Sequence, residues 1–239
     1  MEGYIHSYET FATLDGGGIR GMIFLSGCSF RCSYCHNPDT WYTNGKKTSS
    51  EEVIAKIARN KRYYKNGGVT ISGGEPLLQG EFVCELLKGF KKENLHTALD
   101  TSACVLPSNI DEILKFVDLI ILDLKFPTEE LYVKYCKGSI TNVLKLIKLA
   151  NKYDKKVLLR TVIVPDINDS RKMLDQYLEI AKTVRNCKYE LLGYHTLGVD
   201  KYKKLGLKYE LADVKAMDGD KLIELQKYID KEMKADEQG

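Results

Sequence analysis

The stretch that decides the fold is Met22-Ile23-Phe24-Leu25-Ser26-Gly27-Cys28-Ser29-Phe30-Arg31-Cys32-Ser33-Tyr34-Cys35. It opens with a short apolar run, which is typical of a buried strand, and it closes with three cysteines at C-x3-C-x2-C spacing. Cysteine thiolates are the usual ligands of iron-sulfur clusters, and a [4Fe-4S] cluster takes one per iron. No fourth cysteine follows nearby, so this loop predicts a cluster with one iron open to a small molecule.

Two other uses of these cysteines stay open as alternatives. Structural zinc prefers paired C-x2-C units, and only Cys32 and Cys35 have that spacing. A disulfide framework is typical of short secreted chains, whereas this chain has 239 residues, an odd number of cysteines (seven) and no expected secretory signal. The four remaining cysteines are scattered through separate segments and are expected to be small packing side chains. They are Cys84, Cys104, Cys136 and Cys187.

Composition predicts one soluble, cytoplasmic domain over residues 1–239. Apolar residues make up 44% of the chain, enough for a core, and no apolar run approaches the length of a membrane span. The net charge is only +3, and the lysine-rich stretch 201–208 lacks the density of a nucleic-acid footprint. We expect no nucleic-acid or membrane partner. That stretch is interpreted as a solvated face, with docking of a protein as the alternative.

Strand-like and helix-like segments alternate along the chain. The predicted strands are 22–26, 69–72, 97–99, 119–122, 157–164 and 189–192. A capping box at Ser49 to Glu52 predicts the start of a helix, and similar helical patterns follow Gln79, Ser108, Ser139, Asp169 and Asp218. Six strand-helix units predict an α/β fold, an incomplete (β/α)6 TIM-like barrel of parallel strands.

Each predicted strand contributes polar or glycine residues, at its end in five cases and, in the fifth strand, within the strand. In chain order they are Gly27-Cys28, Ser72-Gly73-Gly74-Glu75-Pro76, Asp100-Thr101, Asp123-Leu124-Lys125, Arg160 and Tyr194-His195. Because ligand-binding groups of parallel α/β folds collect at the carboxyl ends of the strands, we expect these residues to form one site.

The cysteine loop, combined with Gly73-Gly74-Glu75-Pro76 after the second strand, resembles the radical S-adenosylmethionine (radical SAM) superfamily. Within it, further segments are similar to the activases of glycyl radical enzymes: Asp15-Gly16-Gly17-Gly18-Ile19-Arg20, residues 24–28, Tyr34-Cys35-His36-Asn37, residues 96–101, Asp123-Leu124-Lys125, Arg160 with residues 162–165, and Tyr194-His195. Residues 37–68 contain no cysteine and leave no room for the ferredoxin-like insertion of many such activases. The resemblance therefore favours the branch that acts on pyruvate formate-lyase.

The resemblance implies the chemistry and the site. Cys28, Cys32 and Cys35 would hold a [4Fe-4S] cluster that cleaves SAM reductively to a 5′-deoxyadenosyl radical, which removes an α-hydrogen from a glycine of the partner enzyme. The residues implied to bind SAM are Tyr34, Cys35, His36, Gly73, Gly74, Glu75, Asp123, Leu124, Lys125 and His195. Asp100, Thr101 and Asp123 are implied near a monovalent cation, and Asp15 and Arg160 near the substrate peptide. The expected partners are pyruvate formate-lyase and a flavodoxin- or ferredoxin-like electron donor, with the chain itself a monomer.

Plainer interpretations stay open at several of these positions. Gly73-Gly74 could form an ordinary tight turn, Tyr34 and His195 could be structural, and Asp123 could simply pair with Lys125. For the whole chain, the alternatives are another glycyl radical activase, a radical SAM enzyme acting on a small pterin-like molecule, and an iron-sulfur electron carrier. The chain also departs from the activase pattern in having Gly17 where proline is usual, which predicts a looser peptide-binding loop.

Overall fold

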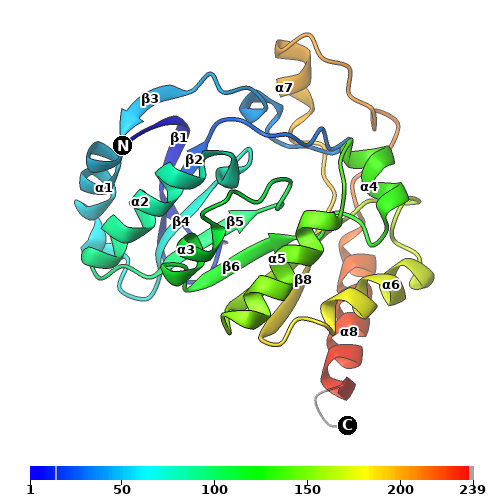
Figure 1. Cartoon of the computed structure of the whole chain (residues 1–239). Coiled ribbons are helices and arrows are strands. Elements are labelled where there is room, and N and C mark those ends of the chain that lie inside the picture. The colour runs from blue at the N-terminus through cyan, green and yellow to red at the C-terminus, as the bar shows by residue number, and fades with distance from the viewer. Residues whose placement is uncertain (14, 237–239) are drawn as a thin grey trace.

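The computed structural model describes residues 1–13 and 15–236. Within them the chain forms a single curved sheet of eight strands in the order β3-β1-β2-β4-β5-β6-β7-β8 (Figure 1). Strands β3 and β8 are the two ends of this order and do not pair with each other, so the barrel is open. The predicted fold class, an incomplete barrel of mostly parallel strands, is confirmed.

All six predicted strands are present, and neighbours among them pair in parallel. They are β2 (Arg20–Leu25), β4 (Gly68–Gly73), β5 (Thr97–Thr101), β6 (Leu119–Asp123), β7 (Lys156–Ile163) and β8 (Cys187–Gly193). The central strands β4, β5 and β6 are almost wholly buried, as expected for parallel strands that are covered on both faces. The register sets Leu25 beside Gly73 and Asp123 beside Arg160, which brings the strand-end residues to one edge of the sheet.

Two strands were not predicted, β1 (Glu2–Ala12) and β3 (Lys46–Ser49). They extend the sheet antiparallel beyond β2. In β1 only Gly3 and Ile5 are buried, so the strand lacks the apolar run of the inner strands. The edge strand β3 starts with two exposed lysines, which discourage pairing with another chain.

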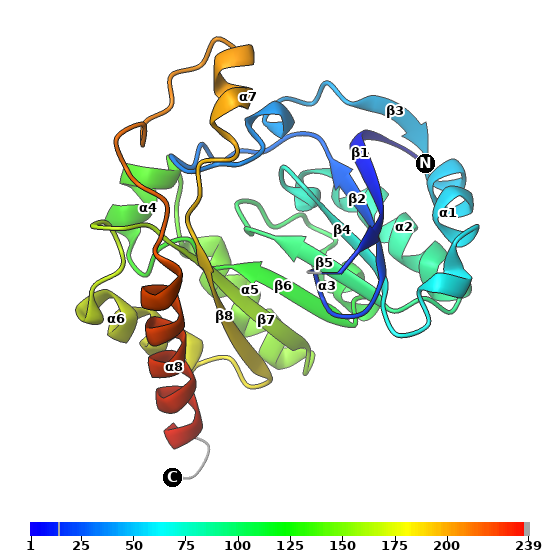
Figure 2. The same ribbon diagram turned by 180° about the vertical axis from the view of Figure 1, so that it is seen from behind.

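The helices lie mainly on the convex side of the sheet (Figures 1 and 2). They are α1 (Ser50–Ala58), α2 (Gly80–Lys92), α3 (Ile110–Lys115), α4 (Glu129–Cys136), α5 (Thr141–Lys152), α6 (Arg171–Ala181), α7 (Val199–Lys204) and α8 (Gly219–Asp236), with 3-10 turns η1 (Pro38–Thr40), η2 (Lys61–Tyr63) and η3 (Pro76–Gln79). The predicted capping box begins α1, where the Ser49 hydroxyl accepts a 3.2 Å hydrogen bond from the Glu52 amide. The sequence did not predict α4 and α7. None of the helices in the described part of the chain is both long and apolar enough to cross a membrane.

Candidate active site

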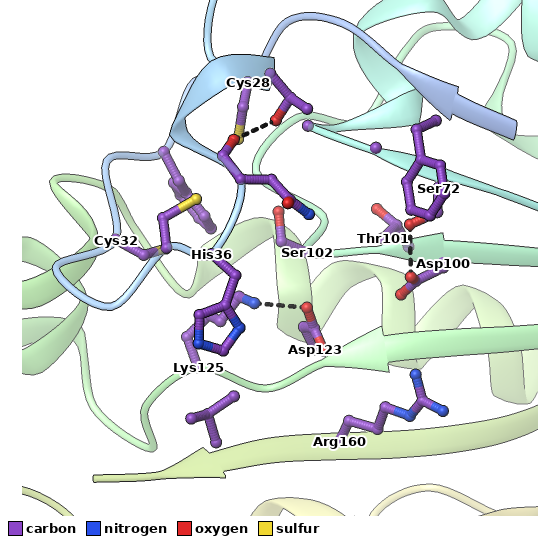
Figure 3. Close-up of a pocket in the computed structure, with 18 of the residues that line it drawn as sticks. Cys28, Cys32, His36, Ser72, Asp100, Thr101, Ser102, Asp123, Lys125 and Arg160 are labelled. Carbon is purple, nitrogen blue, oxygen red and sulfur yellow. Dashed lines mark hydrogen bonds and ion pairs between the residues drawn. The ribbon is translucent and has the colours of Figure 1, made fainter. Parts of the chain in front are cut away.

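A cavity of about 300 Å³ opens on the concave side of the sheet, where the strands end (Figure 3). The predicted site residues that line it are Asp15, Cys28, Cys32, Tyr34, Cys35, His36, Gly73, Gly74, Asp100, Thr101, Asp123, Lys125 and Arg160. Three predicted residues, Glu75, Leu124 and His195, do not line the cavity. The sequence pattern therefore located one site, built from segments that are far apart in the chain.

The cysteine loop is fixed by backbone hydrogen bonds on both sides. The amide of Gly27 donates to the Thr40 carbonyl (2.7 Å), and the amide of Arg31 donates to the Cys136 carbonyl at the end of α4 (2.8 Å). The Arg31 guanidinium donates to the Cys28 carbonyl and stacks over the Trp41 ring, 4.9 Å from its centre. Because both flanks are held, the loop presents its three sulfur atoms from a defined backbone.

Each of the three sulfur atoms has a different environment. The thiol of Cys28 is hydrogen-bonded to Cys104, which with burial raises the pKa of Cys28; Cys32 is bonded in the same way to Cys136, with the same effect. Burial raises the pKa of Cys35 to about 11, although hydrogen bonds from the Asn37 amide and the Trp41 indole act in the opposite direction. Two of the cysteines interpreted as scattered packing residues thus lie beside the predicted ligands.

Close packing of the backbone leaves no room for a side chain at Gly73 or Gly74. Gly73 has φ +131°, and a Cβ there would collide with Leu25 on β2; at Gly74 a Cβ would collide with the carbonyl oxygen of Gly27. The Gly74 amide donates to the Leu25 carbonyl (2.9 Å). These glycines therefore let the turn after β4 press against the start of the cysteine loop while lining the cavity.

Glu75 is fully buried next to that turn and is not among the residues that line the cavity. It accepts hydrogen bonds from the Thr101 hydroxyl (2.6 Å), from the hydroxyl and amide of Ser102 (2.7 and 3.0 Å), from the Leu77 amide (3.0 Å) and from the Cys104 amide (3.4 Å). Burial raises the pKa of Glu75, and these donors oppose the rise. The residue joins the turn after β4 to the loop after β5.

Asp100 and Asp123 approach the cavity from neighbouring strands (Figure 3). Asp100 accepts a hydrogen bond from the Ser72 hydroxyl (2.7 Å), and burial together with the negative charge of Asp123 raises its pKa to about 7. Asp123 pairs with Lys125 at 2.5 Å, so the salt bridge considered from the sequence exists. The hydroxyl of Thr101 donates to Glu75 and accepts from the Ala103 amide (2.9 Å).

Lys125 lies between Asp123 and the cysteine loop. Burial alone would lower the pKa of its ammonium group, but the carboxylate of Asp123 and the thiol of Cys32 outweigh burial and raise it. The next residue back, Leu124, is buried, and its amide donates to the Arg160 carbonyl (2.8 Å). The Tyr34 ring is buried against Phe126, 6.0 Å between ring centres, while one side of the residue lines the cavity.

His36 and His195 stack on each other. Their ring centres are 3.8 Å apart with an interplanar angle of 13°, and His36 Nε2 lies 3.1 Å from the His195 carbonyl oxygen. Burial and the neighbouring His195 lower the pKa of His36. The Nδ1 atom of His195 is buried, and no donor or acceptor from the described residues reaches it. A buried ring nitrogen of this kind fits a polar ligand.

Arg160 lies within β7, as predicted, and its side chain is only 8% exposed. It pairs with Asp15 at 2.9 Å and with Glu190 on β8 at 3.0 Å. The sequence analysis missed Glu190. A charged residue in the predicted strand 189–192, level with Arg160 on the neighbouring strand, was the signal that could have found it.

The lysine-rich stretch 201–208 is partly a contact with the cysteine loop. Lys201 Nζ donates to Asn37 (2.8 Å) and pairs with Asp39 (3.0 Å), and the Tyr202 hydroxyl donates to the Cys35 carbonyl (3.0 Å). Figure 1 shows α7 in orange next to the blue segment that follows β2. The prediction of a solvated face is therefore correct for Lys203, Lys204 and Lys208, which are exposed, whereas Lys201 packs against the segment after the cysteine loop.

Comparison with known proteins agrees with this geometry. The family model described as "Radical SAM superfamily" matches residues 22–178, from β2 to within α6. The chain belongs to the radical SAM superfamily. It is 44% identical to the pyruvate formate-lyase-activating enzyme of Clostridium pasteurianum over 231 residues, 95% of this chain and 97% of that one. The enzyme of the same name from Staphylococcus epidermidis is 38% identical over 240 residues, 96% of each chain.

Solved structures support the radical SAM fold. Streptococcus suis SuiB bound to its precursor peptide SuiA matches with a TM-score of 0.70 at 21% identity, covering 96% of this chain and 48% of SuiB. A domain of a pyruvate-formate lyase-activating enzyme from Bacteroides vulgatus matches with a TM-score of 0.57 at 23% identity, covering 72% of this chain and 95% of that domain.

The cofactors of this superfamily are a [4Fe-4S] cluster and SAM, and the residues fit both. Among the described residues, no three His, Cys, Asp or Glu side chains are arranged to hold a single metal ion. The three loop cysteines nevertheless line one cavity, as ligands spaced around a larger cluster would. The unpartnered His195 Nδ1 and the paired acidic and basic groups suit the charged, nitrogen-rich SAM molecule.

Proposed function

We propose that this chain activates pyruvate formate-lyase by generating a glycyl radical in it. The observation that carries the proposal is one cavity that joins the three-cysteine loop to the polar ends of the parallel strands, in a chain similar over nearly its whole length to enzymes named for this activity. When bound, the cluster and SAM supply the reductive cleavage whose radical product removes the glycine hydrogen. The protein binds and orients these cofactors and shields the reaction.

Within this proposal, Cys28, Cys32 and Cys35 are the cluster ligands. The ammonium group of Lys125 lies near Cys32, and its positive charge favours the thiolate that a metal needs. The amide of Asn37 and the indole of Trp41 donate to Cys35. Hydrogen bonds to a ligand sulfur are one of the factors that set a cluster's potential.

SAM would occupy the rest of the cavity. We assign its methionyl end to the backbone of Gly73 and Gly74, held in place by Glu75, and its nucleoside end to Tyr34, His36 and the backbone around Cys35. Asp123, Leu124, Lys125 and His195 complete the site, with His195 Nδ1 available for a hydrogen bond. Asp100, Thr101 and Asp123 are proposed to lie near a monovalent cation, which would offset the repulsion between the two carboxylates.

Asp15 and Arg160 are proposed to hold the glycine-bearing loop of the partner. They form an ion pair on the cavity wall, and a guanidinium and a carboxylate together can bind peptide carbonyl and amide groups. The proposal includes a single domain over residues 1–239, a monomer in the cytoplasm, and a flavodoxin- or ferredoxin-like protein as the electron donor.

The deciding experiment uses the reduced, cluster-reconstituted protein with SAM and pyruvate formate-lyase under anaerobic conditions. We expect a glycyl radical in the electron paramagnetic resonance spectrum and release of 5′-deoxyadenosine. Cys28→Ala is the matched control and should abolish both signals. Release of 5′-deoxyadenosine without a glycyl radical would mean that the partner is a different protein or a small molecule.

Substitutions at Arg160 test whether this residue binds the substrate peptide or SAM. Arg160→Ala should leave SAM cleavage nearly unchanged and weaken activation of the partner, and Arg160→Lys should restore part of it because the pairing with Asp15 can partly re-form. If SAM cleavage falls as far as activation, Arg160 belongs to the cofactor site.

A further inference from the structure

Arg20, the first residue of β2, is a buried arginine without an acidic partner. The residue is 1% exposed, and in the part of the chain that the structure describes no carboxylate forms an ion pair with its guanidinium. Burial lowers the pKa of Arg20 to about 10, which still leaves it protonated at neutral pH. A buried cation is costly unless its donors find acceptors, so the hydrogen bonds of Arg20 show what holds it.

Neutral acceptors surround the Arg20 guanidinium. Its Nε donates to the Thr70 hydroxyl on β4 (2.7 Å), and its Nη2 donates to the carbonyls of Val69 (2.7 Å) and His96 (3.4 Å). Nη2 also lies 3.2 Å from the Nδ1 atom of His96, the residue before β5. Because a guanidinium can only donate, Nδ1 is the acceptor, and the imidazole is therefore neutral with its proton on Nε2.

Thr70 connects Arg20 to Asp15. The buried Thr70 hydroxyl accepts from Arg20 and donates to the Asp15 carbonyl (2.9 Å). The next residue, Gly16, lies against the guanidinium, because a Cβ on Gly16 would be 3.3 Å from Arg20 Nε. The peptide unit between Asp15 and Gly16 is thus held by Arg20 and Thr70, while the Asp15 carboxylate pairs with Arg160 at the cavity (2.9 Å).

His96 is an exposed residue at the amino ends of the strands, away from the cavity. Partial burial of its ring and the positive charge of Arg20 lower the pKa of His96, and the carboxylate of Asp118 acts in the opposite direction. The neutral imidazole is therefore favoured in the folded protein, and protonation occurs below the ordinary value of 6.5. The charged groups around His96 are Arg20, Lys91, Asp118, Asp154, Lys155 and Lys156.

We propose that His96, Arg20 and Thr70 are positioning residues for the substrate peptide: the neutral imidazole of His96 orients Arg20, which through Thr70 holds Asp15 in place to bind the peptide. The inference rests on the proposed role of Asp15 in binding the glycine-bearing loop of the partner. It makes peptide binding sensitive to the protonation of a residue that lies outside the cavity.

Protonation of His96 breaks this arrangement. An imidazolium donates from both ring nitrogens, so its Nδ1 no longer accepts from Arg20, and the two neighbouring cations repel each other. The guanidinium then moves away from His96. Because the same guanidinium is bonded to Thr70, the movement also changes the hydrogen bond that holds the Asp15 carbonyl.

The amide of Gly16 tests the connection without any partner, because it belongs to the same peptide unit as the Asp15 carbonyl. The chain has two Asp-Gly bonds, at 15–16 and 218–219, so ¹³C at the Asp carbonyl and ¹⁵N at glycine select these two amides by NMR. In the cluster-reconstituted, oxidised protein, the Gly16 signal should move between about pH 8 and about pH 5.5 with the same midpoint as the His96 imidazole, and Gly219 should not. A Gly16 signal that does not follow His96 would overturn the proposal.

Variants of His96 separate the hydrogen-bond acceptor from the charge. Asparagine supplies an acceptor oxygen and does not titrate, so His96→Asn should keep the Gly16 signal at its neutral wild-type position at every pH. His96→Ala lacks the acceptor and should displace that signal at every pH. His6→Asn, at another exposed histidine, is the control and should titrate like the wild type. Movement of Gly16 in His96→Asn equal to that in the wild type would assign the effect to another group and contradict the proposal.

Peptide binding tests the functional consequence. The probe is a synthetic peptide of the glycine-bearing loop of pyruvate formate-lyase, titrated by fluorescence anisotropy into the reconstituted protein with SAM but without a reductant. The wild-type affinity should fall about two- to tenfold from about pH 7.5 to about pH 5.5, as for the loss of one hydrogen bond, and that of His96→Asn less than about twofold. Equal losses would refute the positioning role. If no variant binds the peptide at any pH, the proposed function fails, and the Gly16 titration still decides whether His96 positions Asp15.

Discussion

Glu75 shows how one buried carboxylate can organise a site without lining it. Five donors from the turn after β4 and the loop after β5 converge on its two oxygens. The Gly73-Gly74 turn and Thr101, both on the cavity wall, are thereby held to each other. The sequence resemblance implies that Glu75 orders this turn and belongs to the SAM-binding set, and only the structure shows that it does not line the cavity.

Replacing Glu75 by glutamine should therefore destabilise the protein. An amide has only one acceptor oxygen, so some of the donors would be left without partners, at a cost of about 1–3 kcal/mol in the free energy of unfolding. Urea unfolding of the cofactor-free protein measures this cost. Glu179→Gln, on the exposed face of α6, is the control and should change stability by no more than about 0.5 kcal/mol. Equal stability of the two variants would contradict the bracing role.

Gly17 is the position where the chain departs from the activase pattern. Its φ is +80°, between Gly16 at +111° and Gly18 at +65°, whereas proline requires a φ of about −65°. The loop at Asp15 therefore follows a path that proline could not adopt. The sequence predicted only a looser loop. The structure shows a defined backbone conformation instead, in which Gly16, Gly17 and Gly18 all have positive φ.

Gly17→Ala isolates the cost of that conformation, because a Cβ at Gly17 meets no atom within 4 Å. We expect a loss of about 1–2 kcal/mol from the left-handed backbone alone. Gly219→Ala is the matched control: its Cβ also meets nothing within 4 Å, but the residue begins α8, where alanine should stabilise by up to about 1 kcal/mol. Thermal unfolding that shifts in the same direction for both variants would contradict the backbone argument.

At the scale of elements, the sequence predicted what is buried and missed what is amphipathic or short. Strands β2, β4, β5 and β6 are largely buried, whereas β7 carries Arg160 and the end strand β8 alternates. Strand β1 buries only two residues, and α4 and α7 bury only two and one, too few for a clear period. The two missed helices flank the cysteine loop, so its supports could not be foreseen.

Asp118 joins three elements at the opposite edge of the sheet. It accepts from the Thr97 amide at the start of β5 (2.8 Å) and pairs with Lys91 of α2 (2.9 Å). Burial would raise the pKa of this carboxyl, but Lys91 and Thr97 outweigh burial and lower it below its ordinary value of 3.8. A lowered pKa in the folded state means that the ionised group stabilises the fold above that ordinary value, and that this stability is lost on acidification.

Asp118→Asn should therefore reduce the loss of unfolding free energy that occurs at acidic pH. We expect the free energy of unfolding of the wild type to fall as the pH drops below about 4, and that of the variant to fall less over the same range. Asp213→Asn, at an exposed position, should retain the wild-type slope. Urea unfolding across this pH range measures the difference. The same pH dependence of the unfolding free energy in all three proteins would mean that Asp118 does not contribute to acid sensitivity.

At the scale of the whole molecule, the location of the site was predictable and its internal pairing was not. Parallel strands bring their carboxyl ends together whatever their sequence, so the polar residues there had to meet. Which side chains pair depends on register and rotamer: Arg160 pairs with Glu190 on the neighbouring strand, and Lys201 of α7 pairs with Asp39. Such long-range partners leave no periodic signal in a single sequence.

A long-range contact joins α7 to the segment after the cysteine loop, and it gives the last prediction. Lys201 holds Asn37 and Asp39 on η1, next to the loop, through a half-exposed ion pair whose loss should cost about 0.5–1 kcal/mol. If the loop must open for the cluster to leave, Lys201→Ala should release iron to a chelator about two- to fivefold faster. The control is Lys204→Ala, which removes one positive charge from an exposed position of the same helix. This variant should release iron at the wild-type rate. Equal rates for the two variants would mean that α7 does not hold the loop closed.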